Sequence, residues 1–403
     1  MNEQPIAAAH AWHPPGLLLA CHNCGAAYQR PVLEPGQWAQ CERCDHVLET
    51  YAVFTPRAWL AVIVAALLCF MLANAYPIAT LLISGQSQAA SFFDAIVITW
   101  QAGYPEVAVV SFAAGFLLPF VQLLLLLWVF LALSVGRLPQ KFEELVSLVD
   151  LLKPWCMVPV FLMGILVSVV KLVGLASLVP GVGLFATAVS AIFVTALTRL
   201  SAQRIRCLAY DHGLPAPLEP LPKAPSPASF HRTWALIVAA ALLYIPANFL
   251  PIMQINSIAG DSAHTILGGV IELVSMGSYG IAAVVFIASV VVPLFKLVCL
   301  GALVYLAQRR ATGALRTRTH LYEVVEFIGQ WSMLDVFVVI LLSALGRFGN
   351  LLTIDPGGGA VAFAGVVILT MLAALGFDPR LAWRRAGHRR HHLPESAKMA
   401  SVS

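Results

Sequence analysis

Eight long apolar segments restrict what this chain of 403 residues can fold into. A helix needs ~20 apolar residues to cross ~30 Å of hydrocarbon, and these segments reach or approach that length. Charged residues make up only 11% of the chain, whereas soluble domains carry about 25%. Buried core helices of a soluble protein are therefore a poor alternative, and we predict an all-α polytopic membrane protein. The segments are residues 58–82, 106–135, 154–172, 182–203, 234–255, 279–307, 331–348 and 360–377.

The second half of the chain repeats the first. At a shift of 174 residues, Asn-Ala-Tyr-Pro-Ile at 74–78 aligns with Asn-Phe-Leu-Pro-Ile at 248–252. At a shift of 176 residues, Pro-Gly at 180–181 aligns with Pro-Gly at 356–357. Rare residue types match in order, which indicates duplication of one unit. We therefore predict two tandem four-helix transmembrane bundles with eight transmembrane helices.

Composition divides the chain into five parts. A polar, cysteine-containing segment precedes the first apolar run, and a proline-rich stretch at 214–229 reads as a semi-rigid linker between the halves. The predicted parts are a metal-binding knuckle (1–54), a first bundle (55–206), a linker (207–232), a second bundle (233–380) and a basic tail (381–403).

The orientation follows from the placement of Lys and Arg, which concentrate in cytoplasmic loops. The connections after the second, fourth and sixth segments and the tail each carry several Lys or Arg residues, whereas residues 83–105 and 256–278 contain neither type. We therefore place both termini in the cytoplasm. Residues 83–105 and 253–278 are only mildly apolar, and we expect short interfacial or half-inserted helices there, on the outer side.

Four cysteines form a metal-binding pattern near the N-terminus. Cys21 and Cys24, and Cys41 and Cys44, make two C-x2-C pairs with sixteen residues between them. Each pair can direct two thiolates at one ion, and two pairs close a tetrahedron, as in structural zinc sites. Disulfides or an iron site are the alternatives, and a reducing cytoplasm argues against disulfides. We predict structural zinc with no open coordination position and therefore no catalysis.

The second half has no such knuckle. Before its first apolar segment, only Arg206-Cys207 is left of the motif. We interpret this as loss of a second metal site. The carboxylates on the cytoplasmic approaches to the third and seventh segments, Glu143, Glu144, Glu323 and Glu326, are expected to be solvated.

Ionisable residues at membrane depth distinguish the halves. Lys296 aligns with Gln122, and Asp335 aligns with Pro159, so only the second half carries these charges. Such residues are costly in a membrane and often functional. Helical spacing puts further polar residues on the same faces, and the predicted polar path comprises Lys296, Asp335, Ser332, Ser289, Thr370, Ser343 and Arg347. A structural Lys296–Asp335 pair that fixes helix register is the alternative.

Gln-Trp-Ser-Met-Leu-Asp-Val-Phe at residues 330–337 is the most specific string in the chain. Together with the cysteine pairs and the repeat, it resembles the paraquat-inducible protein A family over about residues 17–380. The resemblance implies an inner-membrane protein of Gram-negative bacteria that works with a periplasmic partner built of mammalian-cell-entry (MCE) domains. It also implies movement of lipids, hence phospholipids, between the two membranes. Family members often carry two knuckles, so a joint role of two is in doubt here.

These observations lead to one preferred function. We expect an inner-membrane subunit of an intermembrane lipid transport system, in which Lys296 and Asp335 couple proton movement to lipid extraction or delivery. A non-transporting membrane scaffold or envelope-stress protein is the alternative. The sequence contains no catalytic constellation and no phosphate-binding G-x-x-x-x-G-K-[ST] loop. We therefore expect no enzymatic activity and no nucleic-acid partner.

Overall fold

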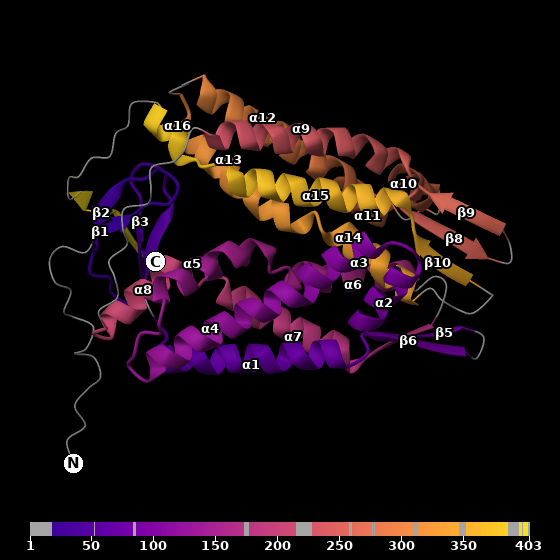
Figure 1. The fold of residues 1–403 in the computed structure, drawn as a ribbon, viewed down its shortest axis with the longest axis horizontal. Helices are drawn as coiled ribbons and strands as arrows, with labels where there is room; N and C mark the ends of the chain where they lie inside the picture. The colour runs from indigo at the N-terminus through magenta and orange to yellow at the C-terminus, as the bar shows by residue number, and fades with distance from the viewer. Residues whose placement is uncertain are drawn as a thin grey trace, which may run out of the picture.

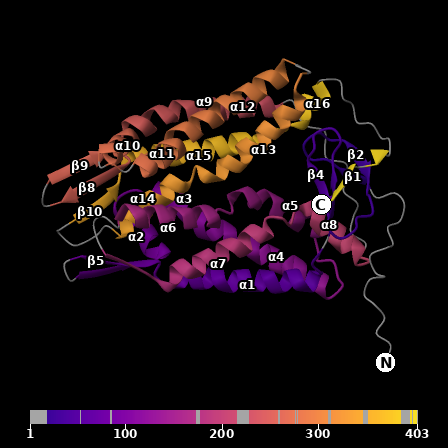
Figure 2. The ribbon, with the colours of Figure 1, turned by 180° about the vertical axis from the view of Figure 1, so that it is seen from behind.

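A computed structural model shows an elongated, mostly helical molecule (Figure 1). A small β domain lies at one end, β-hairpins lie at the other, and long helices run between them (Figures 1 and 2). The structure describes residues 18–51, 53–83, 86–172, 177–214, 228–257, 260–275, 277, 279–309, 313–345, 352–385, 395–396 and 398–401.

The N-terminal β domain consists of two hairpins, β1 with β2 and β3 with β4. Two short strands near the C-terminus, β11 and β12, pair with β2 and β3 respectively. The bounds are β1 Leu18–Ala20, β2 Ala27–Gln29, β3 Gln37–Gln40, β4 Val47–Thr50, β11 Glu395–Ser396 and β12 Lys398–Ser401.

The first half forms the lower layer of Figure 1. Its long helices are α1, the α3–η2–α4 unit, α6 and α7, and the amphipathic α5 and the short α8 lie near the β domain (Figure 1). The bounds are α1 Pro56–Ala75, β5 Ala79–Ile83, β6 Gln86–Ala90, α2 Phe92–Gln101, α3 Pro105–Phe112, η2 Ala113–Leu117, α4 Leu118–Ser134, α5 Phe142–Leu152, η3 Lys153–Trp155, α6 Val158–Leu172, β7 Ser177–Pro180, α7 Val182–Leu197 and α8 Ala202–Asp211.

The second half forms the upper layer and, apart from the 3-10 helix η3 of the first half, has the same order of elements up to its fourth long helix, α15. The bounds are α9 Ala228–Phe249, β8 Met253–Ser257, β9 Gly260–His264, α10 Ile266–Ser275, α11 Tyr279–Phe286, η4 Ile287–Val291, α12 Val292–Gln308, α13 Leu315–Trp331, α14 Leu334–Leu345, β10 Leu352–Pro356, α15 Gly358–Gly376 and α16 Arg380–Arg385.

A π-helical turn occurs at the same aligned position in each half. The turns η2 and η4 both end just before a helix whose second residue is a proline, Pro119 or Pro293. A proline has no N–H to donate to the carbonyl four residues earlier, and such a local defect favours a widened turn. The duplicated sequence therefore reproduces a duplicated irregularity.

Six helices of the described chain are long and apolar enough to cross a membrane, and α7 with α8 would make a seventh span if this pair, bent by 69°, counts as one. The sequence analysis expected eight. The helix α14 has only 12 described residues, or about 18 Å at 1.5 Å per residue. The six are Pro56–Ala75, Pro105–Ser134, Phe142–Ser168, Ser229–Phe249, Ile287–Gln308 and Gly358–Arg384.

The first apolar segment of each half ends earlier than expected, and strands follow it. Tyr76 is extended because it precedes Pro77, so α1 ends at Ala75 and the chain continues as β5. In each half a hairpin and a third, distant strand form a sheet, in the orders β6-β5-β7 and β10-β8-β9. The expectation of helices alone in residues 83–105 and 253–278 was therefore incomplete, although the short helices α2 and α10 do lie in these segments.

The repeated Pro-Ile and Pro-Gly motifs meet at these sheets. The Gly181 N–H donates to the Ile78 carbonyl at 2.9 Å, and the Gly357 N–H donates to the Ile252 carbonyl at 2.9 Å. A Cβ added at Gly181 would lie 2.2 Å from the Pro77 carbonyl oxygen, and one added at Gly357 would lie 2.2 Å from the Pro251 carbonyl oxygen. Only glycine fits this approach, which explains why both halves have it.

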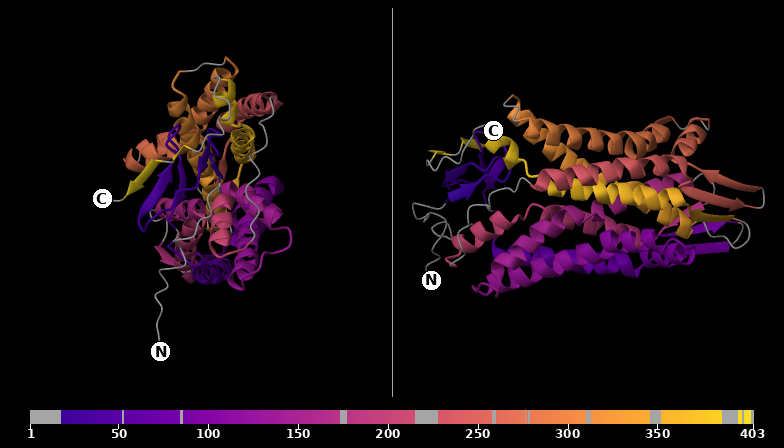
Figure 3. Two further views of the ribbon diagram at one scale, coloured as in Figure 1. Left: turned by 90° about the vertical axis from the view of Figure 1, so that its left-hand side faces the viewer. Right: turned by 45° about the horizontal axis from the view of Figure 1, so that its top comes forward.

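The two halves pack through α6 and α14. The rings of Phe161 and Phe337 meet edge to face with centroids 5.3 Å apart. A Cβ at Gly164 would lie 3.1 Å from the Cβ of Phe337, so the two helices approach closely. Figure 3 shows the halves as two layers of roughly aligned helices. One buried apolar cluster spans both halves, and a smaller one lies within each.

Candidate functional site

Lys296 lies inside the second half and is 1% exposed. It sits on α12, and its Nζ donates to Thr370 Oγ1 on α15 at 2.9 Å and to Ser332 Oγ, in the turn between α13 and α14, at 3.4 Å. A Cβ at Gly329 would lie 3.9 Å from Nζ, so α13 also passes close to the ammonium. Three of the seven predicted residues thus meet, from three separate segments.

The surroundings of this ammonium are unusual for a charge. Among the described side chains, its hydrogen-bond partners are two hydroxyl groups, which carry no charge. An ionised amine in such a site has lost its hydration and lacks full compensation, which costs several kcal/mol or favours its neutral form. The cluster therefore places a titratable amine where its described hydrogen-bond partners carry no countercharge.

The first half is neutral at the aligned positions. Gln122 replaces Lys296 and is 3% exposed, and its Oε1 has no hydrogen-bond partner among the described residues. Cys156 replaces Ser332 and Val194 replaces Thr370, and both are buried. The same scaffold therefore holds a basic cluster in only one of its two copies.

Ser289 lies in the π-helical turn η4, directly before α12, and is 2% exposed. It lines a cavity of about 60 Å³ whose other walls are almost entirely apolar. Since water takes up ≈ 30 Å³ in the liquid, this volume suits one or two waters or a short piece of an alkyl chain. The cavity is also lined by Ile252, Met253, Thr265, Ile266, Val338 and Leu342.

The other predicted path residues have different positions. Ser343, fully buried on α14, donates to the Val339 carbonyl of its own helix at 2.9 Å. Asp335 is the second residue of α14, one turn beyond Ser332, and its side chain lies outside what the structure describes. Arg347 also lies outside the described residues.

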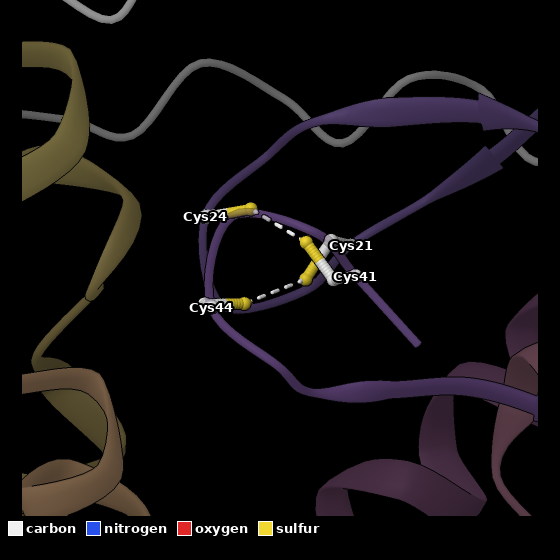
Figure 4. Close-up of side chains that lie close together, drawn as sticks. All are labelled: Cys21, Cys24, Cys41 and Cys44. Atoms are coloured by element: carbon white, nitrogen blue, oxygen red, sulfur yellow. Dashed lines mark hydrogen bonds between the residues drawn. The ribbon is translucent and has the colours of Figure 1, made fainter. Parts of the chain in front are cut away.

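The four predicted zinc ligands converge at the end of the molecule that carries the β domain. The sulfurs of Cys21, Cys24, Cys41 and Cys44 all lie within 4.8 Å of one another and are buried (Figure 4). The Cys21–Cys44 and Cys24–Cys41 sulfur pairs are 3.5 Å apart.

Two tight turns bring these sulfurs together. Gly25 follows the first pair with φ 74°, and Asp45 follows the second with φ 58°. Each donates its N–H to the carbonyl of the first cysteine in its pair, at 2.9 and 2.8 Å. Glycine and aspartate tolerate this left-handed backbone better than most residues.

The donor set fits zinc. A tetrahedron with Zn–S bonds of ≈ 2.3 Å has sulfurs ~3.8 Å apart, close to the spacing here. The Tyr28 hydroxyl lies 3.2 Å from Cys41 Sγ, where it can donate to a thiolate. A bound zinc ion would cross-link the two turns, and four sulfurs leave it no open position. Within the predicted knuckle of residues 1–54, residues 18–51 contain these turns and strands, and the name knuckle refers to them from here on.

The knuckle contacts α13 through a cluster that the sequence analysis missed. The Glu323 carboxylate accepts from Asn23 Nδ2 at 2.6 Å and lies 2.8 Å from His46 Nδ1. This contact raises the pKa of His46 and lowers the pKa of Glu323. Sequence patterns do not indicate contacts between residues 300 positions apart, such as Asn23 and Glu323. The expectation that Glu323 is solvated was therefore wrong.

The other cytoplasmic carboxylates divide into two kinds. Glu143 pairs with Arg206 of α8 at 2.7 Å, and burial raises the pKa of Glu326, so neither is simply solvated. Glu144 is 71% exposed and pairs with Lys141 at 3.3 Å. The expectation of a solvated face holds for Glu144.

A family model described as "Paraquat-inducible protein A" matches this chain twice, at residues 57–206 and 230–387. "Intermembrane transport protein PqiA" of Escherichia coli is 34% identical, with 93% of this chain and 97% of that protein covered. A "Probable intermembrane transport protein" of Haemophilus influenzae is 28% identical (92% and 97% covered). "Lipophilic envelope-spanning tunnel protein A" of E. coli is also 28% identical, with 92% of each chain covered. No solved structure matches.

Proposed function

From its membership of the paraquat-inducible protein A family, to which this chain belongs, we propose that it is the inner-membrane subunit of an intermembrane lipid transport system. The resemblance inferred from residues 330–337 is confirmed, and the chain is a multi-pass membrane protein whose relatives are named as transport proteins. The cargo we propose is phospholipid, passed to or from a periplasmic MCE-domain partner.

We further propose eight spans, four in each half, with both termini in the cytoplasm. In this count α14 is one span, and α7 is one span without α8. The knuckle, α8 and α16 lie at one end of the molecule and the hairpins at the other (Figure 1). Basic residues support a cytoplasmic knuckle end, since α8 and α13 carry Arg204, Arg206, Arg316 and Arg318. In this proposal residues 55–206 form one bundle and residues 233–380 form the other.

The observation that carries a transport role is the buried Lys296 cluster of the second half. An ammonium held at membrane depth by Thr370 and Ser332 is an expensive arrangement, and the aligned Gln122 shows that the scaffold does not need it. In this proposal Asp335 is the acidic partner. A proton that moves from the Lys296 ammonium to the Asp335 carboxylate leaves both groups neutral, which lowers the cost of burying them.

Ser289 extends this polar path toward the hairpin end. It lies in the turn that continues into the helix of Lys296, and it lines the small apolar cavity. In this proposal a change of charge at Lys296 alters the electrostatic potential next to a cavity that fits part of an acyl chain. We propose that proton transfer along this path supplies energy for lipid movement. Zinc stays outside the path as a structural ion.

The test compares aligned positions in the two halves. Purified protein in liposomes, with its MCE-domain partner outside, would transfer a fluorescent phospholipid under an imposed pH gradient. Lys296→Met and Asp335→Asn each remove one charge, and Gln122→Met is the matched control in the first half. We expect transfer to fall at least about tenfold in the first two and to stay normal in the control.

Two outcomes would reject the proposal in favour of a non-transporting scaffold or stress protein. One is unchanged transfer in Lys296→Met and Asp335→Asn with normal amounts of reconstituted protein. The other is failure of the unsubstituted protein to bind the partner or to move lipid at any pH gradient.

A further inference from the structure

The knuckle touches both halves of the protein through charged contacts, which are nearly buried at the first half and partly exposed at the second. Arg30 of the knuckle extends its guanidinium between two carboxylates, Glu49 at 2.5 Å and Asp211 at 2.7 Å. All three side chains are nearly buried, at 5%, 10% and 12% exposure. Asp211 is the last residue of α8, so this contact joins the knuckle to the first half.

The helix α8 is itself fastened to the first bundle. The Asp150 carboxylate of α5 accepts the Ala202 N–H at the start of α8, at 3.0 and 3.1 Å. Arg206 of α8 pairs with Glu143 of α5 at 2.7 Å. Through these contacts, α8 links Asp211 to α5.

The contact with the second half involves both cysteine turns. Glu323 of α13 holds Asn23 of the first turn and His46 beside the second. Arg316, at the start of α13, donates from its Nε to the Arg43 carbonyl at 2.8 Å, also in the second turn. Trp383 of α16 and Leu315 of α13 share the buried cluster that contains the four cysteines.

We infer that the zinc knuckle is a brace that fixes α8 of the first half and α13 of the second half relative to each other. A bound zinc ion would hold in shape the two turns that present Asn23 and His46 to α13, while Arg30 pairs with Asp211 of α8. Because α13 leads directly into Ser332, the brace also bears on the segment next to Lys296. This role is mechanical and does not depend on what the protein transports.

The sequence has one set of C-x2-C pairs, and the knuckle that it forms contacts both halves. Where a second knuckle would precede the second bundle, the chain instead forms α8, which carries the buried Cys207 and is fastened to the first half. Instead of holding its own metal, this segment ends on Asp211 and docks to the remaining knuckle. One metal-stabilised unit thereby serves both halves.

Hydrogen–deuterium exchange on the full-length protein in nanodiscs tests the brace. A brace transmits a change at one contact to the other half, whereas a passive appendage shows only local effects. Asp211→Asn in α8 should speed exchange of α13 residues 315–326, and Glu323→Gln in α13 should speed exchange of α8, each about tenfold. Glu144→Gln, an exposed ion-pair residue on α5, is the matched control and should change neither helix.

Zinc content is measured in every variant to show that the knuckle still forms. Arg30→Lys is a second variant, since lysine keeps the charge but lacks the fork that spans two carboxylates. Removal of zinc from the unsubstituted protein with a chelator should loosen α8 and α13 together. Exchange that changes only at the substituted helix, or is unaffected by zinc removal, would overturn the inference.

Discussion

Lys296 Nζ lies 2.9 Å from Thr370 Oγ1, although the two residues are on different helices, α12 and α15, 74 positions apart. Both side chains are 1% exposed. The Thr370 hydroxyl donates a hydrogen bond to the Val367 carbonyl at 2.9 Å, so its oxygen lone pairs are free to accept from the Lys296 ammonium. This orientation makes Thr370 an acceptor for Lys296.

Removal of that acceptor should destabilise the second half. Thr370→Val keeps the shape but leaves the ammonium with one hydroxyl fewer, at a cost of about 1–3 kcal/mol. Thermal unfolding of the detergent-solubilised protein measures this. The control is Thr187→Val, because the buried Thr187 hydroxyl donates only to its own helix, to the Gly183 carbonyl at 2.7 Å. An equal or larger effect in the control would contradict the assigned role of Thr370.

Replacing the cation itself should have the opposite effect on stability. Lys296→Met has a similar length and removes an ionised amine whose described hydrogen-bond partners are uncharged, so the cost of burying that charge disappears. We therefore expect the midpoint of thermal unfolding to stay the same or rise while lipid transfer is lost. A large fall in the midpoint would indicate that Lys296 serves mainly to hold the helices in register.

Helix faces could be predicted from spacing, but their neighbours could not. Lys296 and Ser332 stood out because the two halves differ at these positions. Periodicity shows which residues share a face, yet it does not say which faces meet, so the place of Thr370 beside Lys296 is visible only in three dimensions. Ser343 shared a predicted face and instead bonds within its own helix.

Local chemistry and distant pairing explain the remaining successes and failures. The cysteine pairs were predicted because each turn is encoded within four residues. The strand β5 was missed because Ala-Thr-Leu-Leu-Ile continues an apolar run, and it pairs with β7 almost a hundred residues later. The Asn23–Glu323 contact was missed for the same reason, since three hundred residues separate its partners.

Loss of one zinc ligand should unfold the knuckle and leave the bundles intact. Structural zinc contributes ≈ 10–16 kcal/mol in small zinc-binding peptides, far more than a domain of this size obtains from its apolar core. We expect one zinc per chain in the unsubstituted protein and almost none in Cys24→Ser, by elemental analysis. Helical circular dichroism should change little, because the apolar clusters of the two halves contain none of the four ligands.

Cys69→Ser is the control for that experiment. Cys69 lies in α1 and outside the metal cluster, so this variant should keep its zinc. Full zinc content in Cys24→Ser would show that the ion, if bound, is held by other residues. An equal loss in both variants would indicate general misfolding and not a specific ligand role.

The close approach of Gly357 to the Pro251 carbonyl at the hairpin end leads to a prediction that does not involve charge. In Gly357→Ala the new Cβ would lie 2.2 Å from the Pro251 carbonyl oxygen, so α15 and the α9–β8 connection must move apart. Forced overpacking of this kind costs about 1–3 kcal/mol. Gly280→Ala is the matched control, since a Cβ there meets nothing within 4 Å and alanine favours a helix by up to ~1 kcal/mol. Thermal unfolding should therefore show a lower midpoint in Gly357→Ala and an equal or higher midpoint in Gly280→Ala. Equal midpoints in the two variants would mean that Gly357 is not closely packed against the Pro251 carbonyl.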